Sequence, residues 1–191
     1  MDRRELLKMI VAATGAAMVG LPALVHGKVP AAGAMPAFSD ADIGTLDEIA
    51  ETILPRTRTP GAKDAGAGAF MATFVSDCYT ARQQTTFRAG LVDIDKRAGG
   101  RFASLTPEAR TELLRALDAE AKARKADVTE TGTPEEGEAM PHYFTMLKQL
   151  AIFGFFTSKV GATGVLQYVA VPGRYDGDLA YVPGTPAWGT S

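Results

Sequence analysis

Ligands for metals and redox cofactors are scarce in this sequence. Its 191 residues include one cysteine, Cys78, and two histidines, His26 and His142. An iron–sulfur cluster needs about four cysteine-type ligands, covalent haem needs a C-x-x-C-H motif, and zinc needs about four closely spaced ligands. No G-x-G-x-x-G loop follows a predicted strand, so the dinucleotide-binding fingerprint is missing too. We therefore expect this chain to hold no cofactor and no metal.

Strong charge is also lacking, and so are long apolar runs after the N-terminal segment. The formal net charge is −2 and no basic stripe is present, so the sequence predicts no nucleic-acid partner. The longest later apolar run, 150–157, is far shorter than the roughly 17–25 residues that span a bilayer. With 46% hydrophobic and 22% charged residues, the composition is typical of a globular domain.

The first 34 residues have the layout of an export signal. A positive n-region precedes residues 9–25, which carry no charge, and the small residues around Gly27 or Ala34 suit cleavage. The twin-arginine pattern, an arginine pair followed by an apolar pair and a lysine, is met by Arg3, Arg4, Leu6, Leu7 and Lys8. We predict that residues 1–34 are a twin-arginine signal peptide with a short linker, and that the protein is exported to the periplasm.

Two other interpretations of this segment stay open. One is an ordinary secretory signal that contains adjacent arginines, and the other is an uncleaved membrane anchor, for which residues 9–25 are short. Twin-arginine export usually serves proteins that receive a cofactor in the cytoplasm, yet this chain lacks cofactor ligands. Either a cofactor is bound by means that the sequence does not reveal, or it belongs to a partner exported in the same complex.

Residues 35–170 show helical periodicity and almost no strand alternation, so we predict one compact, mainly α-helical domain. The expected helices lie within 36–55, 69–100, 104–125, 141–158 and 162–169. Ser39 and Thr106 are expected N-caps. The stretch 69–100 should form two helices that part near Arg82–Thr86.

Apolar residues at helical spacing mark the expected buried faces. They are Ile43, Leu46, Ile49, Ala50 and Ile53; Phe70, Phe74 and Cys78; Phe87, Leu91 and Ile94; and Leu113, Leu114, Leu117 and Ala121. Cys78 is therefore expected to be a small buried residue, with a bridge to another chain as the alternative in an oxidising compartment. The helix past Leu150 is apolar nearly all round, which predicts a place in the core or against a partner.

The last segment, 171–191, has proline or glycine every few positions and is predicted to be an irregular, extended tail. It carries three large rings, those of Tyr175, Tyr181 and Trp188, which a free tail has little reason to expose. We expect the tail to pack on a partner subunit, with packing on the chain's own core as the alternative.

His142 is the only histidine after the predicted signal, and it stands at the start of an expected helix. A capping or surface role is our prediction for it. The rival hypothesis is a stand-alone periplasmic enzyme, hydrolase-like, that uses His142 with the nearby carboxylates Glu135, Glu136 and Glu138.

Four short motifs resemble a known family. They are Ile53-Leu54-Pro55, Thr59-Pro60-Gly61-Ala62, Phe156-Thr157-Ser158 with Gly161, and Val171-Pro172-Gly173-Arg174-Tyr175. As a set, spread over residues 39–183, they resemble the gluconate 2-dehydrogenase subunit 3 family, the small subunit of membrane-bound, FAD-dependent sugar and sugar-acid dehydrogenases. Some members carry a cysteine after the last motif, where this chain has Asp178.

The resemblance implies a mainly α, non-catalytic subunit of an acceptor-dependent dehydrogenase that acts on CH–OH groups. It implies three partners: a catalytic flavoprotein of the glucose–methanol–choline type, a multi-haem cytochrome c and the twin-arginine translocase. FAD, with or without an iron–sulfur cluster, would belong to the flavoprotein and haem c to the cytochrome. The small subunit would aid maturation of the flavoprotein and export it. We expect the interface to include Phe153, Phe155, Phe156, Pro172, Arg174, Tyr175, Tyr181 and Trp188.

Overall fold

The computed structural model describes residues 35–125, 140–171, 173, 177–180 and 182–189. The chain divides into two units, Met1–Pro36 and Ala37–Ser191, and the description below concerns the second. Several predicted functional residues lie outside the described residues: Arg3, Arg4, Leu6, Leu7 and Lys8 of the export signal, Glu135, Glu136 and Glu138, and Pro172, Arg174, Tyr175 and Tyr181 of the tail.

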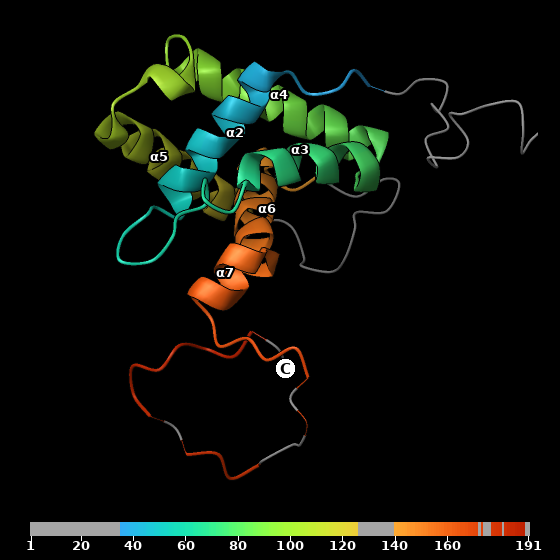
Figure 1. Ribbon diagram of the computed structural model, residues 1–191. Coiled ribbons are helices and arrows are strands. Elements are labelled where there is room, and N and C mark those ends of the chain that lie inside the picture. Colours follow the sequence, from blue (N-terminus) through green and yellow to red (C-terminus); the bar gives the residue numbers. More distant parts are fainter. Residues whose placement is uncertain (1–34, 126–139, 172, 174–176, 181, 190–191) are drawn as a thin grey trace, which may run out of the picture. The chain divides into compact units, whose positions relative to one another are not determined.

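The described residues form six α-helices and one short 3-10 helix, labelled as in Figure 1. These are α2 (Asp40–Ile53), α3 (Ala67–Cys78), α4 (Ala81–Arg97), η1 (Phe102–Ser104), α5 (Pro107–Lys125), α6 (Tyr143–Thr157) and α7 (Lys159–Gly164). The only β-type pairing among them is an isolated bridge between Gln167 and Trp188. The predicted mainly α fold is confirmed.

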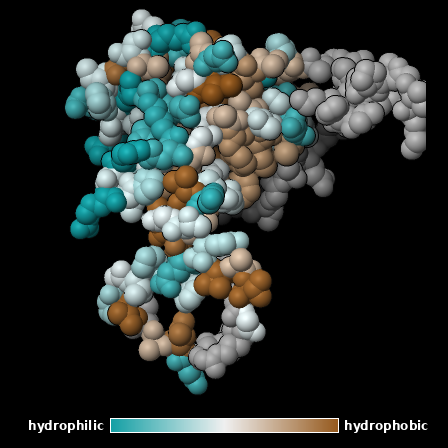
Figure 2. Space-filling view, in the orientation of Figure 1, coloured by the Kyte–Doolittle hydropathy of each residue, from teal (hydrophilic) through white to brown (hydrophobic). Residues whose placement is uncertain are grey.

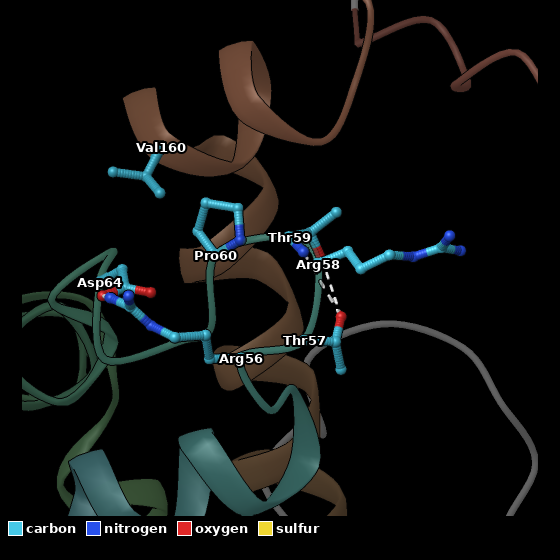
Figure 3. Close-up of a pocket in the computed structure, with 7 residues that line it drawn as sticks. All are labelled: Arg56, Thr57, Arg58, Thr59, Pro60, Asp64 and Val160. Carbon is cyan, nitrogen blue, oxygen red and sulfur yellow. Dashed lines mark hydrogen bonds and ion pairs between the residues drawn. The ribbon is translucent and has the colours of Figure 1, made fainter.

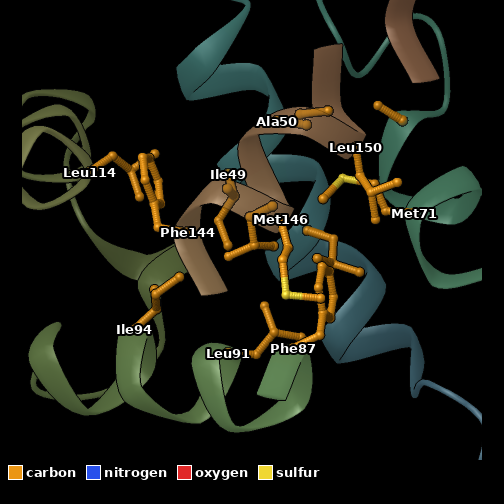
Figure 4. Close-up of a cluster of buried hydrophobic side chains, with 14 of the residues drawn as sticks. Ile49, Ala50, Met71, Phe87, Leu91, Ile94, Leu114, Phe144, Met146 and Leu150 are labelled. Carbon is orange, nitrogen blue, oxygen red and sulfur yellow. The ribbon is translucent and has the colours of Figure 1, made fainter. Parts of the chain in front are cut away.

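Helix α6 is the central element of the domain. It contacts α2, α3, α4 and α5, and the short helix α7 continues from its end (Figure 1). Met146 and Leu150 of α6 reach into the cluster formed by Phe87 and Leu91 of α4 and Met71 of α3 (Figure 4). Burial of these side chains, each worth about 1.5–3 kcal/mol in transfer free energy, holds the helices around α6.

Side-chain caps explain where several helices begin. Ser39 and Thr80 each form a capping box, in which the cap hydroxyl accepts from the third backbone N–H and the third side chain accepts from the cap N–H. Thr106 accepts from the N–H of Ala109 at 3.3 Å, and Pro107 takes the first helical position. The predicted caps at Ser39 and Thr106 are confirmed.

The boundary between α3 and α4 differs from the sequence prediction. The chain breaks at Tyr79–Thr80 instead of within Arg82–Thr86, because the Thr80 capping box with Gln83 starts α4 earlier. The last helix also differs. Helix α7 starts after Ser158 and ends at Gly164, so it overlaps only the beginning of the predicted stretch 162–169.

The buried face of α3 is not the predicted one. Its buried residues are Ala67, Gly68, Met71, Ala72 and Val75. A Cβ at Gly68 would lie 2.5 Å from Asp47 Oδ1 and 2.7 Å from the Ile43 carbonyl oxygen, so the backbones of α2 and α3 approach closely there. This small-residue face turns Phe70 and Phe74 to the margin and leaves Cys78 exposed, so the prediction of a buried Cys78 is wrong.

The predicted core residues of the other helices are largely confirmed. Leu46, Ile49, Ala50, Phe87, Leu91, Ile94, Leu114, Leu117 and Ala121 are buried, whereas Ile43, Ile53 and Leu113 lie at the edge of the core. No helix in the described part of the chain combines the length and the apolar character that crossing a membrane requires.

Candidate partner-binding site

The loop between α2 and α3 is held by two carboxylates. Glu51 of α2 accepts hydrogen bonds from the backbone N–H groups of Arg56 and Lys63, both at 2.9 Å. Asp64 accepts from the N–H of Gly61 at 2.8 Å and pairs with the Arg56 guanidinium. Because the bonds go to backbone groups at both ends of the loop, the path of residues 55–66 is fixed by side chains.

A sharp corner joins α6 to α7, and Ser158 forms it. The Ser158 hydroxyl donates to the Phe155 carbonyl at 2.7 Å and accepts from the Gly161 N–H at 2.9 Å, so one residue ends one helix and caps the next. A Cβ at Gly161 would lie only 2.0 Å from the Phe155 carbonyl oxygen. The corner therefore requires glycine at position 161.

The loop and the corner meet at an open pocket of about 430 Å³. Figure 3 shows Val160 of α7 facing Pro60 of the loop, with the paired Arg56 and Asp64 beside them. Thr57 and Thr59 are joined through their hydroxyl groups at 3.3 Å and complete the lining with Arg58. The pocket thus brings two motifs, far apart in sequence, to one surface.

Three phenylalanines form an aromatic cluster at the margin of α3 and α6, which we call the aromatic margin: Phe70, Phe74 and Phe153. Their ring centroids are 5.7 to 5.8 Å apart, in tilted or edge-to-face arrangements. Phe153 is nevertheless 48% exposed, and its neighbour Ile152 is exposed as well. A partner that covered this margin would remove an already assembled aromatic surface from water.

The structure places the other predicted interface residues differently from Phe153. Phe155 is 3% exposed and belongs to the domain core, where it packs edge-to-face with the half-buried Phe156 at 5.1 Å. Trp188 is exposed and pairs through its backbone with the residue Gln167, beyond α7. Among the predicted interface residues that the structure describes, Phe153 and Trp188 are therefore the exposed ones.

His142 is the N-cap of α6. Its Nδ1 accepts a hydrogen bond from the Phe144 N–H at 3.2 Å, and its ring stacks on that of Tyr143 at 4.5 Å. An acceptor nitrogen must be unprotonated, and partial burial favours the same neutral form by lowering the pKa of His142. The structure gives His142 the capping role that the sequence predicted.

Three of the charged groups near His142 are paired with one another. Asp93 accepts from the Tyr143 hydroxyl at 2.6 Å and from Arg97 at 2.7 Å, and these two hydrogen bonds lower its pKa. Arg97 also pairs with Glu120 at 2.6 Å. Among the described residues, no group of three or more His, Cys, Asp or Glu side chains could hold a metal ion. The arrangement ties α4, α5 and α6 together and does not favour the hydrolase hypothesis.

A family profile described as gluconate 2-dehydrogenase subunit 3 matches residues 40–173. The chain belongs to this family. By its description, the gluconate 2-dehydrogenase subunit 3 family comprises one subunit of a dehydrogenase. This implies association with a catalytic subunit, and it agrees with a chain that is not catalytic by itself. Comparisons with curated proteins and with solved structures gave no match.

The family match contains the loop 55–66, the aromatic margin and the α6–α7 corner. The motifs at Thr59–Ala62 and Phe156–Gly161 are recognisable in the sequence, whereas the two carboxylates that fix the loop, Glu51 and Asp64, were not predicted. Nothing in the local sequence marks Glu51, because its partners lie five and twelve residues away. Asp64 carries a weak signal, an acidic residue three positions after a turn glycine.

Proposed function

We propose that this chain is the non-catalytic small subunit of a periplasmic, FAD-dependent dehydrogenase that oxidises CH–OH groups of a sugar or sugar acid. It binds a catalytic flavoprotein of the glucose–methanol–choline type, aids its maturation, and exports it through the twin-arginine translocase. FAD, with or without an iron–sulfur cluster, belongs to the flavoprotein, and haem c belongs to a cytochrome subunit that links the complex to the inner membrane.

The observation that carries this proposal is the family match over residues 40–173. The match includes both segments that line the pocket, the loop 55–66 and the α6–α7 corner. It is supported by the sequence of the first eight residues, whose arginine pair precedes an apolar pair and a lysine. A folded flavoprotein needs this export route, and a small subunit that carries the signal supplies it. The same reasoning explains why the small subunit itself needs few ligating side chains.

The proposed contact surface combines the aromatic margin with the segment beyond α7. Phe153 and Ile152 expose apolar surface next to rings that are already packed on each other. Interfaces are enriched in exposed aromatic residues of this kind, because they bury a large area with few rotatable bonds.

Co-expression in the native host tests the proposal. The catalytic subunit is produced with the wild-type chain, without it, or with the Arg3→Lys, Arg4→Lys double variant, and periplasmic dehydrogenase activity is measured with an artificial electron acceptor. We expect activity in the periplasm only with the wild-type chain, and both subunits in the cytoplasm with the double variant. Unchanged periplasmic activity in the absence of this chain would refute the proposed role.

A further inference from the structure

The pocket between the loop after α2 and the α6–α7 corner is rich in hydrogen-bond donors. We call it the arginine pocket, and its lining consists of Arg56, Thr57, Arg58, Thr59, Pro60, Asp64 and Val160. Asp64, the single carboxylate of this lining, already accepts from Arg56 and from the Gly61 N–H. The guanidinium groups and the hydroxyls remain able to donate. A ligand that accepts hydrogen bonds and carries negative charge therefore complements this lining.

Arg56 is held in place by Asp64 and still faces solvent. Its side chain is 67% exposed, although one of its terminal nitrogen atoms pairs with the Asp64 carboxylate. The N–H donors of an arginine lie in a planar fork, so one edge of the group can bind Asp64 while another edge binds a second carboxylate. The Arg56 guanidinium is thus oriented before a ligand arrives.

Arg58 lies at the tip of a tight turn. The Thr57 N–H donates to the Thr59 carbonyl at 3.0 Å, and the hydroxyls of these two threonines share a hydrogen bond at 3.3 Å. Because one hydroxyl hydrogen lies between the two oxygens, the other can be donated to a ligand. The exposed Arg58 side chain extends outward from the turn (Figure 3), and among the described residues no carboxylate pairs with it. The turn therefore presents an unpaired guanidinium next to a hydroxyl donor.

The rest of the pocket wall is apolar, and the surface around it is positive. Pro60 faces Val160, and its Cγ lies 3.5 Å from the position that a Cβ would take at Gly164, so the loop packs closely on α7. Lys159 at the start of α7 is exposed, and no carboxylate in the described part of the chain pairs with it. In Figure 2, hydrophilic side chains project at the place of the loop after α2. Since the whole chain has a net charge of −2, this positive surface is a local feature.

We infer that the arginine pocket is a preformed site for an acidic segment of the catalytic subunit. One carboxylate of that segment binds Arg56, a second binds Arg58, and an apolar side chain between them packs on the wall formed by the loop and α7. This inference rests on the proposed function, because it takes that subunit as the occupant. Glu51 and Ser158 fix the backbone on the two sides of the pocket, so association does not have to order it.

The number of charges and the shape of the pocket favour a protein segment. Lipid headgroups are usually recognised by about four to eight clustered basic residues, whereas this lining contains two, and Lys159 adds a third. Sites for small molecules bury about 70–90% of the ligand surface, but this pocket of about 430 Å³ is open to solvent. A protein partner brings its own surface, which excludes water around the charge pairs.

Charge reversal at Arg58 tests the inference. Arg115→Glu, the same change at an exposed arginine of α5, is the matched control for Arg58→Glu. Calorimetry measures the affinity of each chain for the purified catalytic subunit at low and at high ionic strength, and far-ultraviolet circular dichroism checks the helices. We expect Arg58→Glu to bind about tenfold more weakly at low ionic strength. It should also lose part of the salt dependence that the wild type and the control show.

A second variant tests the planar fork of Arg56. Arg56→Lys keeps the positive charge but cannot bind Asp64 and another carboxylate through two edges of one group. We expect several-fold weaker binding, and no change for Arg115→Lys. Asp64 still accepts from the Gly61 N–H in this variant, so the loop keeps an anchor. Urea unfolding of the free chain verifies that the domain is as stable as the wild type.

Labelling of carboxylates identifies the partner group. The catalytic subunit is treated with a carbodiimide and glycine ethyl ester, alone and in the complex, and mass spectrometry locates the carboxylates that the complex protects. Lysine in place of a protected Asp or Glu should weaken binding to the wild-type chain and restore binding to Arg58→Glu. Rescue of one charge reversal by the opposite one shows that the two groups interact, which a general structural effect of Arg58→Glu would not produce.

The outcomes separate this inference from the proposed function. Failure of the wild-type chain to bind the catalytic subunit would contradict both. Tight wild-type binding that Arg58→Glu leaves unchanged, or that Arg115→Glu weakens equally, would overturn the arginine pocket alone. Binding of the chain to vesicles of phosphatidylethanolamine and phosphatidylglycerol that Arg58→Glu abolishes would overturn it in favour of a lipid surface. Saturable binding of inorganic phosphate to the chain alone, lost in Arg58→Glu, would overturn it in favour of a free anion.

Discussion

Single side chains at the loop after α2 and at the α6–α7 corner form hydrogen bonds with backbone groups of neighbouring segments. Glu51 binds two amides of the loop after α2, and Ser158 binds groups on both sides of the α6–α7 corner. Such bonds satisfy backbone groups that would otherwise be left unpaired at helix ends. The geometry of the corner therefore depends on a few short polar residues and on glycine, and substitutions there have large local effects.

Gly161→Ala is expected to destabilise the domain by about 1–3 kcal/mol, because its Cβ would overlap the Phe155 carbonyl oxygen. Gly44→Ala is the matched control. Gly44 lies within α2 with nothing within 4 Å of an added Cβ, so alanine should stabilise the helix by about 0.5–1 kcal/mol. Urea unfolding of both variants measures the difference. A Gly161→Ala protein as stable as Gly44→Ala would show that the corner relaxes freely.

The lowered pKa of His142 predicts a pH dependence of stability. Burial is the main cause of the shift, and the Nδ1 acceptor role agrees with it. The unfolded chain binds the proton more readily than the folded one, so the stabilising contribution is present above the unfolded pKa, about 6.5, and is lost as pH falls through the folded value.

We expect the free energy of unfolding to decrease between about pH 7 and pH 5 in the wild type, and to decrease less in His142→Asn, which keeps a capping group without titrating in this range. Denaturant unfolding at several pH values provides the measurement. The acidic groups with lowered pKa values, such as Asp93 and Asp118, lose their contributions at lower pH, outside this window. If the free energy of unfolding depended on pH equally in the two proteins, the effect could not be assigned to His142.

At the scale of helices, the caps decide where elements begin. The chain between α3 and α4 breaks where Thr80 and Gln83 form a capping box. The interruption lets α4 pack on α6 with Phe87, Leu91 and Ile94 buried. The relative position of two core helices thus depends on one threonine.

Thr80→Ala should therefore destabilise the domain by about 1 kcal/mol, because the N-terminal amides of α4 lose their acceptor. Thr85→Ala, one turn further along the same helix, removes an exposed hydroxyl that bonds only to the Ala81 carbonyl, and should be neutral or slightly stabilising. Thermal unfolding of the two variants tests this. Equal losses would mean that the cap contributes nothing specific.

The helices could be predicted from sequence where apolar spacing and cap residues agree, as for α2 and α5. The prediction failed where packing decides: small residues on α3 let it approach α2, which turned Phe74 and Cys78 away from the core. Periodicity alone predicts that large apolar residues are buried. It does not indicate that a helix face with glycine and alanine can approach its neighbour more closely than the face with the large residues. The Thr80-x-x-Gln83 pattern, by contrast, was a readable signal for the start of α4 that the sequence prediction passed over.

The candidate site could be predicted only as separate motifs. Thr59–Ala62 and Phe156–Gly161 were identified in the sequence, but their meeting at one pocket depends on the path of α6 through the domain. The bridge between Gln167 and Trp188 had no sequence signal, because a single parallel bridge has no periodicity. The export signal stays a prediction, since it lies outside the described residues.

At the scale of the whole molecule, exposed apolar surface is the feature to be tested. Phe153→Ser should weaken co-purification with the catalytic subunit, because it removes a half-exposed ring from the aromatic margin. Val92→Ser, which changes a 70% exposed residue of α4, is the control and should leave the complex intact. Quantitative pull-down of the catalytic subunit with each variant measures the difference. Equal loss of the complex with the two substitutions would show that any exposed polar substitution weakens it, and not the loss of the Phe153 ring in particular.

The exposed position of Cys78 has a practical consequence. It is the single thiol of the chain, free and accessible at the last residue of α3, one turn beyond Phe74. A maleimide dye or spin label will attach there without engineering, next to the aromatic margin, and its signal will report when a partner covers that margin. Air oxidation in the absence of reductant can join two purified copies through this exposed thiol, so a covalent dimer on a gel says nothing about native assembly.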